Sequence, residues 1–191
     1  MPKNLLITLL FLFLLTAGCT AIRPAPLQGE ETMGKIIRSE AGGYEFQAID
    51  GYEVKEYQGT VRLFHPKGDQ LSGPGMLMEV NLFDQQVSLD KAIEVTAKTF
   101  PAYTFTETKE TRVDGLEAVS MDFTTIYHTP DGVVPEYQGA AEGEELRGRI
   151  ILVMVSPTRQ FKCTMLAPAA KWKEVSSSFD AVVESLKFYN R

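Results

Sequence analysis

The chain has few of the residues that usually carry out chemistry: two cysteines, two histidines and one tryptophan among 191 residues. It contains no Gly-x-Ser-x-Gly, His-Glu-x-x-His, Cys-x-x-Cys or phosphate-loop motif, so it shows none of the common hydrolase, zinc or nucleotide signatures. Basic residues are in the minority, with 19 Lys and Arg against 25 Asp and Glu and a formal net charge of −6. This balance argues against nucleic acid as a partner, because its recognition needs a basic patch. We therefore expect a protein that is not an enzyme and that has no cofactor or metal.

The two histidines are candidate catalytic residues, because imidazole is the side chain that titrates near neutral pH. His65 and His128 each stand near the end of a predicted strand and close to a proline. A solvated or capping role is common at such positions, and we expect it for both. The alternative is an envelope hydrolase or metal-dependent enzyme with an unrecognised site near His65 and His128, which proximity of the two histidines would favour.

The N-terminus carries the most specific signal in the sequence. Lys3 precedes an almost unbroken apolar run from Leu5 to Ala17. A charged start, a short apolar core and small residues before a cleavage site are the features of a secretory signal peptide, and about 13 residues fall short of the roughly 20 that span a bilayer. Thr16-Ala17-Gly18-Cys19 is similar to the lipobox of bacterial lipoproteins, whose cysteine thiol receives a diacylglycerol before cleavage.

We therefore predict a signal peptide over residues 1–18 and lipidation of Cys19, with acyl chains such as palmitate anchoring the protein to the cell membrane or the outer membrane. A permanent membrane helix and cleavage without lipidation are the alternatives. Loss of residues 1–18 removes only the charge of Lys3, so the net charge moves from −6 to −7. With Cys19 lipidated, Cys163 has no cysteine partner, and its apolar neighbours Phe161 and Met165 predict a buried structural thiol on one face of a strand.

The rest of the chain divides into a tether and one domain. Residues 19–42 contain several prolines, glycines and charges, which predicts a flexible tether after the lipidated cysteine. Met33, Ile36 and Ile37 could still form a short helix or strand that docks on the domain. Residues 43–191 are expected to form a single domain, because a chain of this size can bury a core without disulfides.

Apolar residues in the domain alternate with polar ones over several short segments, which predicts strands, and recur at helical spacing in two others. The predicted strands cover residues 44–48, 52–57, 60–65, 76–83, 103–111, 117–127, 146–156 and 160–167, and the two helices begin near Ser88 and Trp172. The connections are mostly too short for parallel crossovers. The pattern therefore predicts an α+β fold in which an antiparallel β-sheet of about six to eight strands is sandwiched by two main helices.

A long polar loop from Thr129 to Glu145 interrupts the strands. Val133, Val134 and Tyr137 are apolar or aromatic residues inside this polar segment, which makes them a candidate contact with a partner protein.

Several turn and packing signatures give the chain a resemblance to PsbP-like domains, known from a lumenal subunit of photosystem II and found also in bacterial proteins. They are Gly43-Tyr44-Glu45-Phe46, Asp50-Gly51-Tyr52, Val113-Asp114-Gly115-Leu116-Glu117-Ala118, Trp172, Phe179 and Ser185-Leu186-Lys187-Phe188. The chain has Ile49-Asp50-Gly51-Tyr52 where such domains usually have Pro-x-Gly-Trp. The resemblance implies an α/β/α sandwich and a non-enzymatic binding or assembly module. We therefore expect a membrane-anchored lipoprotein of the bacterial cell envelope with an envelope protein as its partner.

Overall fold

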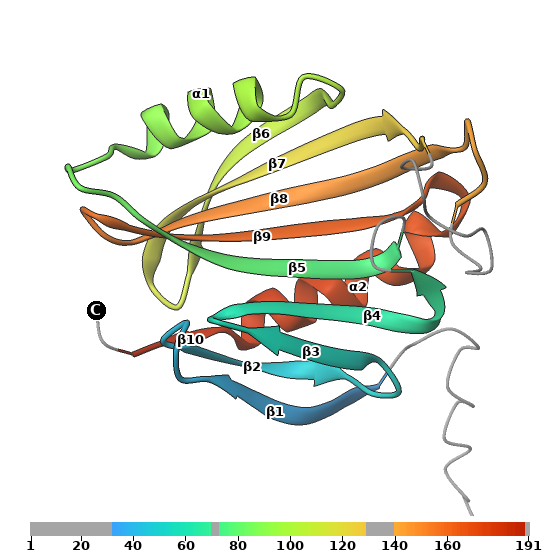
Figure 1. Cartoon of the computed structure of the whole chain (residues 1–191), viewed down its shortest axis with the longest axis horizontal. Helices are drawn as coiled ribbons and strands as arrows, with labels where there is room; N and C mark the ends of the chain where they lie inside the picture. Colours follow the sequence, from blue (N-terminus) through green and yellow to red (C-terminus); the bar gives the residue numbers. More distant parts are fainter. Residues whose placement is uncertain (1–31, 70–72, 129–139, 190–191) are drawn as a thin grey trace, which may run out of the picture.

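The computed structural model describes residues 32–69, 73–128 and 140–189, which form two β-sheets and two α-helices (Figure 1). The strands are β1 (Met33–Ser39), β2 (Tyr44–Ile49), β3 (Glu53–Tyr57), β4 (Thr60–Asp69), β5 (Gly73–Leu82), β6 (Thr104–Val113), β7 (Leu116–Ile126), β8 (Glu145–Ser156), β9 (Arg159–Pro168) and β10 (Lys187–Phe188). The helices are α1 (Leu89–Thr99) and α2 (Ala169–Ser185). The predicted α+β fold is confirmed.

The larger sheet has seven strands in the order β3-β4-β5-β9-β8-β7-β6, and every neighbouring pair is antiparallel. A second sheet, β1-β2-β10, joins the N-terminal strands to the end of the chain. Sequence periodicity indicates where strands lie but not which strands pair, so it did not predict two separate sheets. Asp114 connects the two sheets: its Oδ1 lies 3.0 Å from Lys187 Nζ, and its Oδ2 accepts from the Phe188 N–H at 3.1 Å.

Strand β1 lies within residues 19–42, the range of the predicted tether, and pairs with β2. The alternative of a short docking strand describes this segment. Residues 19–31 lie outside the described residues, and the tether there stays a prediction. Met33 and Ile37 pack against the core, whereas Ile36 between them is exposed. Alternate residues of a strand face opposite sides, so a half-apolar segment of this kind needs a neighbouring strand to become ordered.

Helix α1 begins and ends where the sequence indicates, whereas α2 begins at Ala169, three residues before the predicted start near Trp172. Ser88 is the N-cap of α1, and its Oγ accepts from the Lys91 N–H at 3.2 Å. The helix ends before Phe100, one residue ahead of Pro101. In α2 the buried side chains recur every three to four residues, at Trp172, Val175, Phe179 and Val182.

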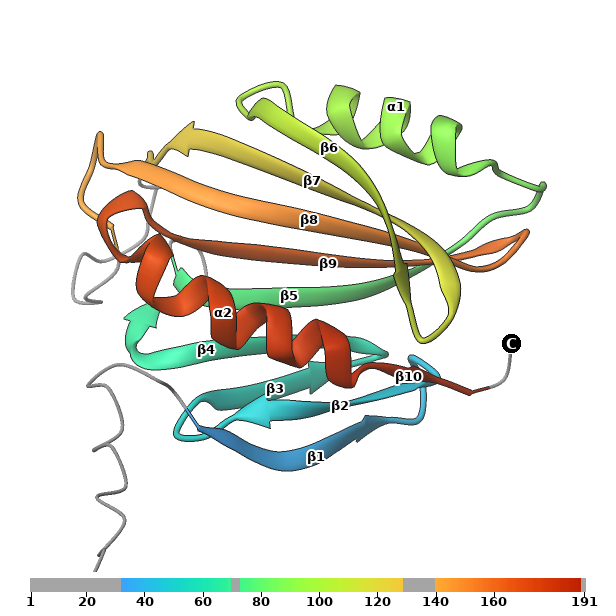
Figure 2. The ribbon, with the colours of Figure 1, turned by 180° about the vertical axis from the view of Figure 1, so that it is seen from behind.

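The two helices cover opposite sides of the seven-stranded sheet. Figure 2 shows α2 running across one side, where it packs against both sheets. We call this side the sealed face and the side that carries α1 the open face. Alternation along the strands separates the two, because Ile151 and Val153 belong to the core under α2 while their neighbours Ile150 and Leu152 belong to the cluster under α1.

The sealed face contains Cys163. Phe161, Cys163 and Met165 are all fully buried there, which confirms the predicted arrangement of this strand. Burial raises the pKa of the Cys163 thiol, because the thiolate would lose its hydration. Cys163 is therefore a structural thiol.

Candidate functional site

Two of the predicted functional features lie outside the described residues. They are the lipidation site Cys19 and the candidate partner contact formed by Val133, Val134 and Tyr137. Both stay predictions. Among the residues that the structure describes, no helix is both long enough and apolar enough to span a membrane.

The two histidines do not share a site. His65 is on β4 and His128 follows β7, and these strands are four strand spacings apart in the sheet, roughly 19 Å. His65 contacts the ring of Tyr52, with the ring centroids 5.4 Å apart, and His128 Nδ1 lies 2.9 Å from Glu142 Oε1 at the surface. Residues 32–69, 73–128 and 140–189 contain no group of three or more His, Cys, Asp or Glu side chains placed to hold a metal ion.

The most pronounced structural feature is the incomplete cover of the open face. Helix α1 packs its buried Ala92 above β7 and β8, on the cluster that contains Met121 and Ile150. Strands β9, β5 and β4 continue the sheet beyond the strands that this helix covers, and their open-face side chains are mostly half-buried. Helix α1 runs along the strands (Figure 1), and a single helix, about 10–12 Å across with its side chains, cannot cover the width of seven strands spaced about 4.8 Å apart.

A groove of about 590 Å³ separates α1 from β5 and β9, and we call it the α1 groove. Along its helical wall, Val95 stands on the outer edge and the small residues Ala92 and Thr96 lie deeper. Its remaining lining residues are Val80, Asn81, Leu82, Phe83, Val87, Lys91, Thr99, Phe100, Gln160 and Lys162. The volume falls within the range of about 300–1,000 Å³ that is typical of small-molecule sites.

Polar groups from two paired strands lie at the base of the α1 groove. Asn81 on β5 is the register partner of Gln160 on β9, and Asn81 Nδ2 donates to Gln160 Oε1 at 3.2 Å. Lys162 Nζ lies 2.8 Å from Glu79 Oε2 and 5.2 Å from the centroid of the Phe100 ring. The Lys162 ammonium is therefore held between a carboxylate and an aromatic face.

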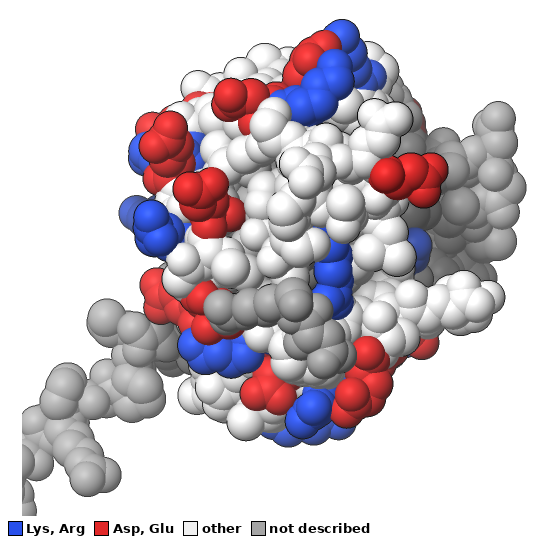
Figure 3. All heavy atoms as spheres, turned by 90° about the vertical axis from the view of Figure 1, so that its left-hand side faces the viewer, with Lys and Arg blue, Asp and Glu red and all other residues white. Residues whose placement is uncertain are grey.

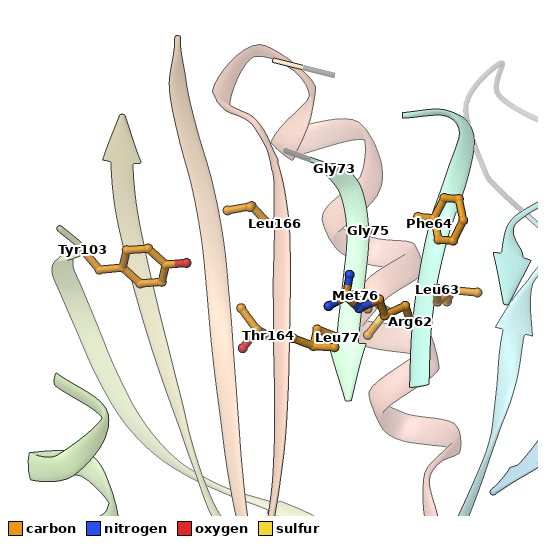
Figure 4. Close-up of a pocket in the computed structure, with 10 residues that line it drawn as sticks. All are labelled: Arg62, Leu63, Phe64, Gly73, Gly75, Met76, Leu77, Tyr103, Thr164 and Leu166. Atoms are coloured by element: carbon orange, nitrogen blue, oxygen red, sulfur yellow. The ribbon is translucent and has the colours of Figure 1, made fainter. Parts of the chain in front are cut away.

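A second, smaller hollow of about 190 Å³ continues along the open face, and we call it the strand hollow (Figure 4). Arg62, Leu77 and Thr164 come from three neighbouring strands at one register level. Tyr103 reaches toward Thr164 and Leu166 from the other side, and its ring stacks on Phe123 with the centroids 4.1 Å apart. Burial raises the pKa of the Tyr103 hydroxyl, so this group stays protonated and can donate a hydrogen bond.

On the face that Figure 3 shows, the charged side chains do not form a patch of one sign. In the view of Figure 3, acidic and basic side chains are interspersed around a broad uncharged area. This distribution suits a local contact with few charges better than a polyanionic partner.

Sequence reasoning did not find the α1 groove. Its residues come from β5, the following loop, α1 and β9, so no local pattern connects them. The sequence contained one signal. Apolar residues occur on both sides of the strand predicted over residues 76–83, which indicates that other elements partly cover both of its faces. The cross-strand partner that completes the groove, Gln160, lies 79 residues from Asn81 and could not be assigned from the sequence.

No protein-family model and no curated protein matches the chain. Solved structures match it at low identity. The chain is similar to cyanobacterial PsbP (CyanoP) from Synechocystis sp. PCC 6803, with a TM-score of 0.57 and 11% identity over 88% of this chain and 99% of that one. It is similar to LpqN of Mycobacterium tuberculosis, described as involved in cell envelope biogenesis, with a TM-score of 0.56 and 9% identity over 84% and 91% of the two chains.

A third similar structure comes from Bacteroides thetaiotaomicron, with a TM-score of 0.52 and 12% identity over 84% of this chain. The chain spans only 50% of that protein's length. At these identities the likeness concerns the fold, and it confirms the PsbP-like resemblance that the turn and packing signatures indicated.

Proposed function

We propose that the protein is a lipid-anchored, non-enzymatic binding module of the bacterial cell envelope. The observation that carries the binding role is the incomplete cover of the open face, where a groove with an apolar wall and a polar base lies beside a rigid sheet. Sites of this composition are typical of ligand binding. The separation of His65 from His128 supports a role without catalysis by these two residues.

The anchoring role rests on the N-terminal sequence. The Thr16-Ala17-Gly18-Cys19 motif follows a short apolar run, and Cys163 in the core is unavailable for lipidation. Two or more acyl chains hold a protein on a bilayer, because each buried methylene contributes about 0.8 kcal/mol. The likeness to LpqN, a protein of cell envelope biogenesis, supports an envelope location.

Metabolic labelling with an alkyne analogue of palmitate tests the anchor. We expect the full-length chain to be labelled and to sediment with membranes, and Cys19→Ala to lose both properties. Cys163→Ala is the matched control, since it removes the only other cysteine and should keep the label. Label that persists in Cys19→Ala, or that disappears in Cys163→Ala, would contradict lipidation at Cys19.

The partner proposed for this module is another envelope protein that contacts the segment 129–145 through Val133, Val134 and Tyr137. A photoreactive amino acid at position 137 should crosslink one defined protein in intact cells. Tyr57 provides the control position, because it is an aromatic residue at the end of β3 with 74% of its surface exposed. Equal crosslinking from positions 57 and 137 would reject this segment as the contact.

A further inference from the structure

The base of the α1 groove contains a hydrogen-bond donor that lacks an acceptor. Gln160 is only 4% exposed, and its Nε2 is the one buried side-chain nitrogen or oxygen without a partner among the described residues. The Oε1 of the same amide already accepts a hydrogen bond from Asn81 Nδ2. A buried donor without an acceptor carries a free-energy cost, because it has lost its hydrogen bonds to water. A bound molecule that offers an oxygen at this point would remove that cost.

The charges of the groove favour a negative oxygen. Lys91 and Lys162 are the only charged side chains among the described residues that line the groove. Lys162 is 15% exposed at its side chain and lies beside Phe100, so its charge acts in partly desolvated surroundings. The carboxylates that pair with the two lysines, Glu94 and Glu79, are not among the lining residues.

The walls of the groove favour an aliphatic chain. Val95 is one of the few large apolar side chains exposed on the described surface, with 47% of its area accessible, and it stands on the rim of the groove. Val87 and Phe100 are half-buried in the cluster beneath α1 and line the same groove. Lys91 and Phe100 are nine residues apart, which gives the helical wall a length of about 13 Å.

We propose that the α1 groove binds a single-chain aliphatic carboxylate. The carboxylate accepts from Gln160 Nε2 and pairs with the ammonium of Lys162, and the chain lies along Val95. The proposal deepens the proposed function by naming a ligand class for the binding module. It does not depend on lipidation of Cys19, so the two can fail separately.

A photoactivatable fatty acid with a terminal alkyne tests the proposal on the full-length protein in an unfractionated, desalted cell lysate without ATP or coenzyme A, so that the protein is present whether or not it is anchored. We expect the label in peptides from α1, β5 or β9, and competition by excess unlabelled palmitate. The amine with the same chain and the same photoreactive group is the matched probe. Because the groove presents ammonium groups, the amine should label about tenfold less.

Two groove variants and one control variant test whether the label depends on the α1 groove. Val95→Asp places a carboxylate on the apolar rim and should reduce labelling about tenfold. Gln160→Leu should also reduce labelling while changing the thermal midpoint little, because it removes both the donor without an acceptor and the acceptor of Asn81 Nδ2. Ile126→Asp is the control, since Ile126 is 48% exposed but does not line the groove, and it should label like the wild type.

Equal labelling by the acid and the amine would overturn the proposal. So would label spread over unrelated peptides, or labelling that Val95→Asp leaves unchanged. A fourth contrary result would be a protein crosslink that Val95→Asp abolishes without any fatty-acid label, because it would assign the groove to a protein contact. Labelled groove peptides in a chain whose Cys19 is unmodified would uphold this proposal while rejecting the anchor.

Discussion

The two faces of the seven-stranded sheet use the same strands in different ways. On the sealed face, α2 and the smaller sheet bury Leu63, Met78, Phe161 and Met165 to 3% exposure or less. On the open face, the neighbouring residues Arg62, Leu77, Lys162 and Thr164 stay half-buried and line two hollows. Sequence neighbours therefore have opposite roles: one set holds the domain together, and the other offers a surface.

This difference separates stability from binding within one sheet. Substitutions on the sealed face should change the free energy of unfolding, and substitutions on the open face should change ligand binding with little effect on unfolding. Such a division lets the binding surface vary without loss of the fold.

The largest expected difference between the faces is in thiol reactivity. Cys163 is on the sealed face and Thr164, the next residue, is on the open face. A maleimide should modify Cys163 only after unfolding, because the thiol is buried and burial raises its pKa. In Cys163→Ala/Thr164→Cys the thiol should react about a thousandfold faster or more, given an unfolding free energy of at least about 5 kcal/mol.

Mass spectrometry of the peptide that contains residues 163 and 164 measures both rates without interference from Cys19. Similar rates for the two thiols would mean that the sealed face opens locally. The claim that the sealed face is closed to reagents while the open face is accessible would then be wrong.

Truncation of a core side chain should give the largest change in stability. Phe179→Ala on α2 removes a fully buried ring that lies 6.2 Å from Trp172 between centroids, and should cost about 3–5 kcal/mol. Leu82→Ala is the control, because Leu82 is 77% exposed, and it should stay within about 0.5 kcal/mol of the wild type. Urea unfolding followed by tryptophan fluorescence measures both. Comparable losses would show that the core is not concentrated under α2.

An ion-pair network at the margin of the sealed face should have an intermediate effect. Arg149 Nε lies 2.6 Å from Asp122 Oδ1, and Arg149 Nη1 lies 2.5 Å from Asp180 Oδ1 on α2. The Asp122 carboxylate is the main cause of a raised pKa for the Arg149 guanidinium. Arg149→Ala should cost about 1–2 kcal/mol, since it leaves two partly buried carboxylates without a cation.

Lys109→Ala is the matched control for the network. Lys109 Nζ lies 2.9 Å from Glu107 Oε1, but both side chains are at least half exposed, so its loss should cost about 0.5 kcal/mol or less. Equal costs in urea unfolding would assign the effect of Arg149 to its alkyl packing or to helix docking and not to partial burial of the charges.

The smallest expected effect concerns α1 on the open face. Hydrogen bonds from Lys91 and Lys98 lower the pKa of Glu94 to about 2, below its ordinary value of 4.5. A lowered pKa in the folded state stabilises the protein above pH 4.5, and this contribution disappears as the pH falls through about 2. Glu94→Gln should therefore lower the thermal midpoint slightly at pH 7 and less at pH 3. Thermal unfolding of Glu94→Gln and the wild type at pH 7 and pH 3 measures this, and an equal change of the midpoint at both pH values would contradict it.

The sequence predicted the elements of the open and sealed faces well. Hydrophobic alternation identified β9 and the burial of Cys163, and Ser88 identified the start of α1. Asp114-Gly115 identified the β6–β7 turn, where the structure has φ values of 51° and 77°. These features depend on a few neighbouring residues, so they can be read locally. The pairing of β1 with β2, and of β10 with β2, depends on contacts between distant segments and was not predicted.

The candidate sites also divide into those that local sequence predicted and one that only the structure revealed. Cys19 and the segment with Val133, Val134 and Tyr137 came from composition and spacing, and they stay predictions. His65 and His128 came from residue type, and the strand order then placed them apart. The α1 groove came only from the structure, because it exists where a single helix fails to cover the full width of the sheet.

The sequence by itself determined the secondary structure, the turn positions, the buried thiol and the signal-like N-terminus, because each follows from residue type and short-range spacing. The tertiary structure decided which strands are neighbours, which face α2 seals and where a donor such as Gln160 Nε2 stays without an acceptor. The physical reason is that strand order and helix docking bring together residues far apart in the chain, and only their packing determines which surface remains open.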